Sequence, residues 1–319
     1  MTDSEATGTG SEPGTDRGDP VDVDAVIAGL AGQGYLAGQG VATALFLAMA
    51  LRRPLFLEGD PGVGKTEIAK ALAAWTGGEL IRLQCYEGLD AAQAVYEWDY
   101  TRQLLHLRAA EATGRAAGVG ETTLEDELYD ERFLVRRPLL AAVAHRDPVP
   151  PVLLVDEVDR ADDEFEAFLL EVLSDYAVTV PEIGRFHAEI PPRVIITSNR
   201  TRDVHDALKR RCLYHWVDHP GFDQEVAIIT SRAPGTGDRL ARQVAAAVEE
   251  LRDLGLYKPP GVAESIDWAE ALARLGASDL TEATLEASLG AVLKYREDHQ
   301  RVLDAGVPDL LARVMARAS

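Results

Sequence analysis

Five short apolar segments are spread over the first two-thirds of the chain. They are "PLFLEG", "ELIRLQC", "PVLLVDE", "RVIITSN" and "LYHWVDH", at 54–59, 79–85, 151–157, 193–199 and 213–219. The third and fourth are almost continuously apolar, which is typical of strands that are covered on both faces. Helical patterns lie between them, and this alternation predicts an α/β fold with a parallel five-stranded sheet between helices.

Two of the intervening segments have clear helical features. The apolar run Val41–Leu51 ends before Arg52 and is too short to cross a bilayer, so we expect a buried helix and no membrane span. A second helix, near 163–174, is predicted to begin with a capping pattern formed by Asp163 and Glu166. Its apolar side chains fall on one face, namely Phe165, Phe168, Leu169 and Val172.

The pattern changes after Pro220, where no further strand of comparable quality follows. Amphipathic periodicity instead predicts helices near 223–232, 238–254, 264–275, 282–297 and 308–317. The second of these carries an apolar stripe made of Leu240, Val244, Val248 and Leu251. We therefore expect an α/β core over 25–219 and a smaller all-helical domain over 220–319.

Composition and charge narrow the function classes. Residues 1–24 are acidic and nearly without apolar side chains, so they are predicted to be a disordered tail. The whole chain has a formal net charge of −21, which argues against nucleic acid as a partner. Cys85 and Cys212 have no metal-type spacing. The N-terminus lacks the features of a signal peptide, so we expect a cytoplasmic protein.

The stretch "GDPGVGKT" lies between the first predicted strand and a helical segment, and it fits G-x-x-x-x-G-K-[ST]. Its glycines let backbone N–H groups close around phosphate oxygens, and the dipole of the following helix adds to the attraction. Lys65 is expected to reach the β- and γ-phosphates of ATP, and Thr66 to bind Mg²⁺. The predicted nucleotide-binding residues are Gly59, Asp60, Pro61, Gly62, Val63, Gly64, Lys65, Thr66 and Glu67.

Hydrolysis requires further groups beside the phosphates. Asp156, at the end of the apolar strand "VLLVDE", is predicted to hold Mg²⁺, and Glu157 to activate the attacking water. Asn199 follows the next strand and offers a polar group at the same sheet edge. Arg210 and Arg211 come soon after, and an arginine here could act in a neighbouring subunit's site or pair with surface acids.

With these parts in this order, the chain resembles the AAA+ ATPases of the MoxR group. The matching landmarks are "GDPGVGKT", "LLVDEVDRADDEFEAFLLEVLSD", "AVTVPEIGRFHAEIPPRVIITSN" and "DALKRRCLYHWVDHPGFDQEVAII". The stretch "CYEGLDAAQAVYEWDYTRQLLHLRAAE" resembles the CoxD-like branch, which is associated with maturation of carbon monoxide dehydrogenase and related molybdenum hydroxylases.

The resemblance carries its own expectations. It implies a P-loop αβα sandwich with a helical lid, a β-hairpin over 176–190, and a hexameric ring with nucleotide between subunits. It identifies Gly59–Thr66 as Walker A, Asp156 and Glu157 as Walker B and Asn199 as sensor 1, with Arg211 as the arginine finger. It also places "YLAGQG" (35–40) at the adenine. No arginine stands near the start of the lid helix, where the family often has a second sensor.

Three functions fit these features. The first is a MoxR-type ATPase that remodels a client protein, such as an immature molybdenum hydroxylase, with a von Willebrand factor A domain protein as a further partner implied by the resemblance. The second is a nucleic-acid motor, which the net charge opposes. The third is a nucleotide-gated scaffold with little turnover, which Glu157 opposes. The stretch 175–190 is either a device that couples hydrolysis to the client or a hairpin that caps the sheet.

Overall fold

The computed structural model describes two stretches of the chain, residues 20–112 and 127–319. Most of the acidic tail predicted over 1–24 lies outside the described residues. The last residues of the predicted tail are described and belong to helix α1 (Val23–Ala31), which begins two residues before the core predicted from residue 25. The helix begins there because the side chain of Asp22 accepts a hydrogen bond from the backbone N–H of Ala25 at 2.8 Å.

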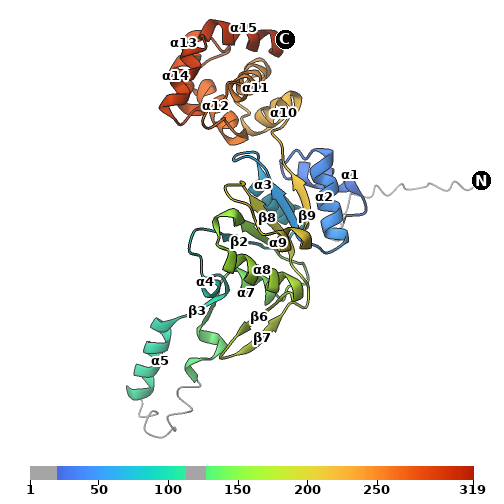
Figure 1. Ribbon diagram of the computed structural model, residues 1–319, viewed down its shortest axis with the longest axis vertical. Coiled ribbons are helices and arrows are strands. Elements are labelled where there is room, and N and C mark those ends of the chain that lie inside the picture. The colour runs from blue at the N-terminus through green and yellow to red at the C-terminus, as the bar shows by residue number, and fades with distance from the viewer. Residues whose placement is uncertain (1–19, 113–126) are drawn as a thin grey trace, which may run out of the picture.

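Parallel strands form the central sheet, in the order β2–β5–β8–β1–β9 (Figure 1). They are β1 (Leu55–Glu58), β2 (Leu80–Gln84), β5 (Val152–Asp156), β8 (Arg193–Ser198) and β9 (Leu213–Trp216). Each lies within one of the segments predicted as strands. The predicted fold class, a P-loop αβα sandwich with a parallel five-stranded sheet, is therefore confirmed.

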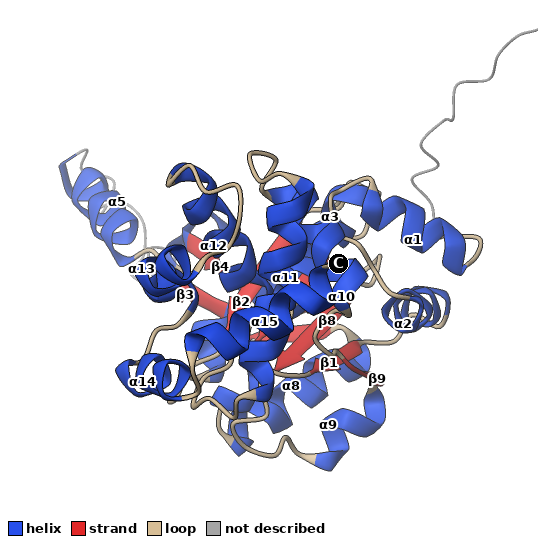
Figure 2. Ribbon diagram, turned by 90° about the horizontal axis from the view of Figure 1, so that it is seen from above, coloured by secondary structure: helices blue, strands red, loops and turns tan. Residues whose placement is uncertain are grey.

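Helices cover both faces of this sheet (Figure 2). Alternate side chains of β1 point to opposite faces, so Leu55 and Leu57 join one hydrophobic core and Phe56 joins another. The first core includes side chains of α1, α2 (Gln39–Ala50) and α3 (Lys65–Thr76). The second includes side chains of α7 (Pro138–Val143), α8 (Asp163–Asp175) and α9 (Asp206–Arg211). The helix predicted over Val41–Leu51 corresponds to α2.

A small two-stranded sheet was not predicted from the sequence. Strand β3 (Tyr96–Trp98) follows the short helix α4 (Ala91–Val95) and pairs antiparallel with β4 (Leu134–Arg136). Helix α5 (Tyr100–Ala112) extends from it, away from the central sheet (Figure 1). Strands of three residues carry too little periodicity to be recognised in a single sequence.

The hairpin expected over 176–190 is present. Its strands, β6 (Ala177–Val180) and β7 (Gly184–His187), pair antiparallel. The hairpin follows α8 directly and leads into β8. Val178 and Val180 are buried in the core on the α8 side of the sheet, and Ile183 packs against it, whereas Glu182 and Arg185 at the tip are exposed.

The capping residues predicted for α8, Asp163 and Glu166, were wrong. The N-cap is Asp162, whose side chain accepts a hydrogen bond from Phe165 N at 2.9 Å. Glu166 takes no part in a capping box, because its carboxylate is buried and is bound by Arg202 and by the backbone N–H of His205. A long-range ion pair has therefore replaced the local contact that the sequence pattern favoured.

Helices alone follow β9, and they share a hydrophobic core of their own. The predicted stripe of Leu240, Val244, Val248 and Leu251 is buried in it.

The described residues include no helix long and apolar enough to cross a membrane. The helices are α10 (Phe222–Arg232), α11 (Asp238–Asp253), α12 (Val262–Arg274), α13 (Glu282–Val292), α14 (Arg296–Asp304) and α15 (Val307–Ala318). This separate core supports the boundary proposed near 219, which stays a prediction.

The single helix predicted over 282–297 was wrong, because α13 ends at Val292 and α14 begins at Arg296. Leu293 is extended, and its side chain is buried in the core of the C-terminal helices. Lys294 Nζ donates to the carbonyl of Ala291 at 2.6 Å, which satisfies an acceptor at the end of α13. Packing of Leu293 thus ends a helix that the local sequence would continue.

Candidate nucleotide-binding site

The loop between β1 and α3 needs its glycines for separate reasons. Gly62 and Gly64 have φ angles of 84° and 95°, in the left-handed region that favours glycine. Gly59 approaches the neighbouring strand so closely that an added Cβ would lie 2.3 Å from the carbonyl oxygen of Val217. The predicted phosphate-binding stretch therefore adopts a loop that other residues would distort.

This loop forms one wall of a cavity of about 830 Å³, a size typical of sites for small-molecule cofactors. Residues 61–67 all line it, and so do Asp156, Glu157 and Asn199. Gly59 and Asp60 lie in the same loop but do not line the cavity. The structure therefore brings together most of the site that the sequence predicts.

Lys65 is the first residue of α3, and only 6% of it is exposed. Its ammonium donates to the carbonyl oxygens of Gly59 and Asp60, both at 2.8 Å. Burial lowers the pKa of Lys65, and the carboxylates of Asp159 and Asp60 partly oppose that shift. The side chain is thus held by its own loop at the wall of the cavity.

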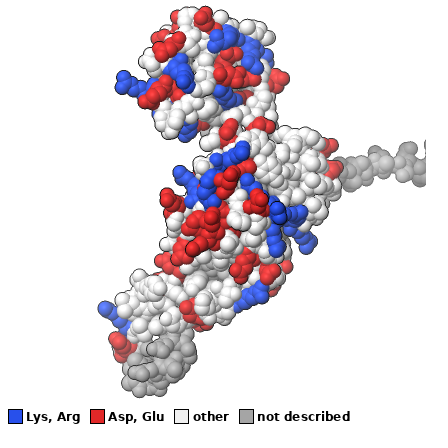
Figure 3. Space-filling model, viewed as in Figure 1, with Lys and Arg blue, Asp and Glu red and all other residues white. Residues whose placement is uncertain are grey.

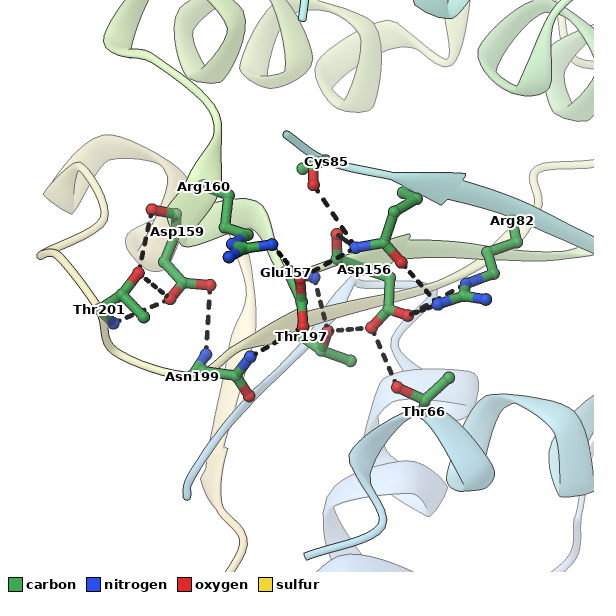
Figure 4. Close-up of polar contacts among 11 residues, drawn as sticks. Thr66, Arg82, Cys85, Asp156, Glu157, Asp159, Arg160, Thr197, Asn199 and Thr201 are labelled. Atoms are coloured by element: carbon green, nitrogen blue, oxygen red, sulfur yellow. Dashed lines mark hydrogen bonds and ion pairs between the residues drawn. The ribbon is translucent and has the colours of Figure 1, made fainter. Parts of the chain in front are cut away.

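Asp156 ends β5 with its carboxylate almost fully buried and hydrogen-bonded on both oxygens (Figure 4). Oδ1 accepts from the hydroxyl of Thr66 at 3.0 Å and from that of Thr197 at 2.6 Å. Oδ2 accepts from Nε of Arg82 at 3.1 Å and from Nη2 at 2.6 Å. Thr66 was expected beside Asp156 from the sequence, whereas Thr197 and Arg82 were not.

Glu157 follows in a left-handed conformation, with φ of 54°, which is uncommon for a residue with a side chain. Its backbone N–H donates to Thr197 Oγ1 at 2.9 Å. Its carboxylate accepts from Asn199 Nδ2 at 3.1 Å and from Gln84 Nε2 at 3.1 Å, and Nη1 of Arg160 lies at 3.4 Å (Figure 4). Asn199 therefore meets Glu157 as the shared sheet edge suggested, whereas Gln84 and Arg160 were missed.

The missed residues left only faint signals in the sequence. Thr197 and Gln84 stand near the ends of β8 and β2, the two neighbours of β5, and in parallel sheets strand ends meet at one edge. A polar residue near the end of any predicted strand could therefore have been considered. Arg82 gave no such signal, because a charged residue inside an edge strand normally faces solvent.

Thr66 and Asp156 offer oxygen donors of the kind that Mg²⁺ prefers. Over residues 20–112 and 127–319, no three His, Cys, Asp or Glu side chains cluster to hold a metal by themselves. Magnesium typically binds through one or two carboxylates together with the phosphates of a substrate. The residues present therefore fit Mg²⁺ that arrives with a nucleotide.

The C-terminal helices contact the phosphate-binding loop through backbone atoms. The N–H of Val262, the first residue of α12, donates to the carbonyl oxygen of Gly62 at 2.9 Å. A Cβ added to Gly62 would lie 2.9 Å from the Cα of Gly261, so the two glycines permit this approach. The start of α12 faces the cavity with apolar side chains, Ala263 and Ile266 among them.

No sensor arginine was assigned from the sequence, and Arg274 is the last residue of α12. The arginine that lines the cavity from the C-terminal helices is instead Arg232, at the end of α10. Its Nη2 lies 2.8 Å from the carboxylate of Glu67. Burial would raise the pKa of Glu67, but Lys70 and Arg232 hold it below its usual value.

The segment 35–40, expected near adenine, borders the same cavity. Tyr35 and Leu36 line it, together with His215 and Trp216 from β9. The carbonyl oxygen of Leu36 accepts a hydrogen bond from Gln224 of α10 at 2.7 Å. Aromatic and apolar groups therefore line the same cavity as the glycine-rich loop, as a site for a nucleotide requires.

Arg210 and Arg211 stand apart from the other predicted site residues. They lie at the end of α9, where both are exposed, and neither lines the cavity. Arg53 fixes this end of the helix, because its guanidinium donates to the carbonyl oxygens of both residues, at 2.9 and 3.1 Å. Figure 3 shows basic side chains gathered over the end of α9. The structure thus leaves both arginines outside the chain's own site, and neither is singled out as the finger.

Comparison with known proteins gives a family for this core. The family model of the AAA domain of the dynein-related subfamily matches residues 54–212. Among solved structures, a mutant of RuvB from Thermotoga maritima is 15% identical, with 94% of this chain and 87% of that chain covered and a TM-score of 0.49. A predicted ATPase from Cytophaga hutchinsonii is 12% identical, with 92% and 93% covered and a TM-score of 0.45. Residues 54–212 thus carry an AAA domain of the dynein-related subfamily.

Proposed function

We propose that this protein hydrolyses ATP with Mg²⁺ and uses the energy to remodel a client protein. The observation that carries the proposal is the single cavity in which Lys65, Thr66, Asp156, Glu157 and Asn199 meet. Anion-binding backbone, a lysine, oxygen donors for a divalent cation and a carboxylate for water are the parts that phosphoryl transfer to water requires. The same parts oppose a scaffold that binds ATP without turnover.

Each residue has a distinct role in this reaction. Backbone N–H groups of the loop bind the phosphates, and Lys65 places its positive charge beside them. Thr66 and Asp156 would hold Mg²⁺, which would supply positive charge to neutralise the transferred group. Glu157 accepts the proton of the attacking water. Asn199 keeps the Glu157 carboxylate oriented through its hydrogen bond at 3.1 Å.

A nucleic-acid motor is the alternative, and charge opposes it. The formal net charge is −21, and on the face drawn in Figure 3 acidic and basic side chains are interspersed over both the core and the C-terminal helices. Phosphate release measured with and without DNA, together with DNA binding titrated with salt, separates the two functions. Tight, salt-sensitive DNA binding with DNA-stimulated ATPase activity would contradict a protein client.

For the client we propose a metalloenzyme of the molybdenum hydroxylase kind, with a von Willebrand factor A domain protein as a further partner and the cytoplasm as the location. The support is the MoxR and CoxD-like resemblance of the motifs around Gly59–Thr66, 85–111 and Asp156. Genes for such proteins beside the gene for this chain would strengthen the proposal.

We further propose that ATP assembles a ring and that Arg211 acts in the neighbouring subunit's site. The support is the exposed position of Arg211 outside its own cavity. Arg211→Ala should therefore retain ATP binding and lose turnover by roughly 10³-fold or more. Mixing it with Glu157→Gln protein, itself inactive, should restore activity in steady-state phosphate release, because some interfaces in a mixed ring hold both intact groups.

Arg210→Ala is the matched control, since it removes the same charge one position earlier and should leave turnover largely intact. If Arg210→Ala lost turnover and Arg211→Ala did not, the finger would be Arg210. Mass photometry that showed only monomers with ATP would contradict the ring itself.

The hairpin β6–β7 is our candidate for coupling hydrolysis to the client. It connects α8, behind Asp156 and Glu157, with β8, which ends next to Asn199. Removing the exposed tip around Glu182–Arg185 should spare basal ATPase activity and abolish maturation of the client, measured as client activity after co-expression. Unchanged client activation would show that the hairpin only caps the sheet.

A further inference from the structure

Arg82 makes a close charged contact in the site, yet the proposed reaction does not use it. It lies in the middle of β2, the strand at the edge of the sheet. Half of its side chain is exposed (50%), whereas the Asp156 side chain that it binds is 4% exposed. Nε and Nη2 both donate to the same carboxylate oxygen, Oδ2, at 3.1 and 2.6 Å. The guanidinium therefore neutralises the buried carboxylate that is predicted to hold Mg²⁺.

The two oxygens of Asp156 are divided between different partners. Oδ1 accepts hydrogen bonds from the hydroxyls of Thr66 and Thr197. The Thr66 hydroxyl can keep this hydrogen bond while a lone pair of its oxygen faces the metal. Oδ2 accepts both of its hydrogen bonds from Arg82. A hydrated Mg²⁺ ion that approaches Asp156 meets a permanently charged guanidinium already in place, because arginine does not lose its proton in proteins.

Arg82 is also connected to Glu157. Its Nη2 donates to Oε1 of Gln84 at 2.5 Å, and Nε2 of Gln84 donates to the carboxylate of Glu157 at 3.1 Å. Gln84 can make both bonds at once because its amide presents an acceptor and a donor. A movement of the guanidinium away from Asp156 therefore weakens the hold on this amide, which otherwise has only long contacts to the carbonyl oxygens of Cys85 and Asp156 besides Glu157.

We propose that Arg82 is a positioning residue that competes with Mg²⁺ for Asp156. In the absence of metal it holds the Asp156 carboxylate and, through Gln84, holds Glu157. When Mg²⁺ arrives with the nucleotide, Arg82 must leave Oδ2, so its affinity for Asp156 sets the Mg²⁺ concentration at which nucleotide is retained. This inference rests on the proposed nucleotide site but not on hydrolysis, the ring or the client.

The competing explanation is that Arg82 only ties β2 to β5. The two explanations predict opposite changes in the Mg²⁺ concentration at which nucleotide binds when Arg82 is replaced. A competitor for the metal, when removed, makes Mg²⁺ bind at lower concentration. A residue that only fixes the position of Asp156, when removed, leaves the metal requirement unchanged or raises it, because the ligand becomes less well ordered.

The test is a Mg²⁺ titration of fluorescent ADP binding to the full-length chain at fixed nucleotide concentration. For Arg82→Gln the midpoint in Mg²⁺ should fall about three- to fivefold, which is the effect that a partly exposed ion pair can supply. Arg82→Lys keeps the charge with fewer donors and should give an intermediate midpoint. The matched control is Arg160→Gln, which removes one positive charge that contacts Glu157 rather than Asp156.

Thermal unfolding gives a second, independent readout. In EDTA, Arg82→Gln should unfold at a lower temperature than wild type, because the buried Asp156 carboxylate loses the guanidinium that neutralises it. Saturating Mg–ADP should remove most of this difference in unfolding temperature. An Arg82→Gln midpoint that is unchanged, raised or shifted no further than that of Arg160→Gln would overturn the inference while leaving the proposed function intact. A wild-type chain that bound no nucleotide would overturn both. Arg82→Lys keeps the test decisive should Arg82→Gln fail to fold.

Discussion

Replacing Lys65 with alanine is expected to abolish nucleotide binding. The ammonium of Lys65 is almost fully buried at the wall of the cavity, where the carbonyl oxygens of Gly59 and Asp60 hold it at 2.8 Å. A lysine in this position contributes a charge-assisted hydrogen bond to phosphate in a site of low dielectric, and alanine removes it completely. We expect the Kd for ATP, measured by calorimetry with Mg²⁺, to rise at least about 100-fold.

Lys70→Ala is the control for this experiment. Lys70 lies on the same helix, α3, but its side chain is 52% exposed and pairs with Glu67 rather than with the loop. It should change the Kd for ATP only slightly. If Lys65→Ala bound ATP as tightly as wild type, the phosphate-binding role of this loop would be wrong.

Exchanging Glu157 for glutamine is expected to separate binding from hydrolysis. The change keeps the size of the side chain, so Asn199 can still donate to its carbonyl oxygen, and the ligands for Mg²⁺ stay intact. The amide cannot accept a proton from water, and loss of a general base typically costs about 10² to 10⁴ in rate. Steady-state phosphate release should fall by that factor while the Kd for ATP stays close to that of wild type.

Glu164→Gln offers a matched change, because Glu164 is an exposed carboxylate in the first turn of α8. It should hydrolyse ATP at the wild-type rate. A Glu157→Gln protein with wild-type turnover would show that another group activates the water. Weak ATP binding by that variant would instead assign Glu157 to the binding of metal or nucleotide.

The candidate site residues that the structure brings together as expected are those whose placement depends on local sequence. A glycine-rich loop between a strand and a helix places Gly62, Lys65 and Thr66 within a few residues of one another. Asp156 ends β5 and Asn199 directly follows β8, and these two parallel strands are neighbours that end at the same edge. The role of Arg211, in contrast, depends on a second subunit and stays a prediction.

Other parts could not be predicted because they depend on contacts between distant segments. Arg82 looked like a solvated residue of an edge strand, and only the pairing of β2 with β5 turns its guanidinium toward Asp156. Glu166 fitted a local cap but is bound by Arg202 from a later loop. Arg232 became part of the cavity wall only because the C-terminal helices pack against the loop at Gly62.

Local patterns in the amino-acid sequence specify the parallel α/β core, the glycine-rich loop of Gly59–Thr66 and the carboxylates beside it. These depend on periodicity, glycine conformation and spacing, all of which act over a few residues. The tertiary structure alone decided which side chains hold those carboxylates and where the helix of 282–297 breaks. A buried charge pairs with a group from a distant segment, and Leu293 is buried against other helices. Both contacts exist only after these segments have packed.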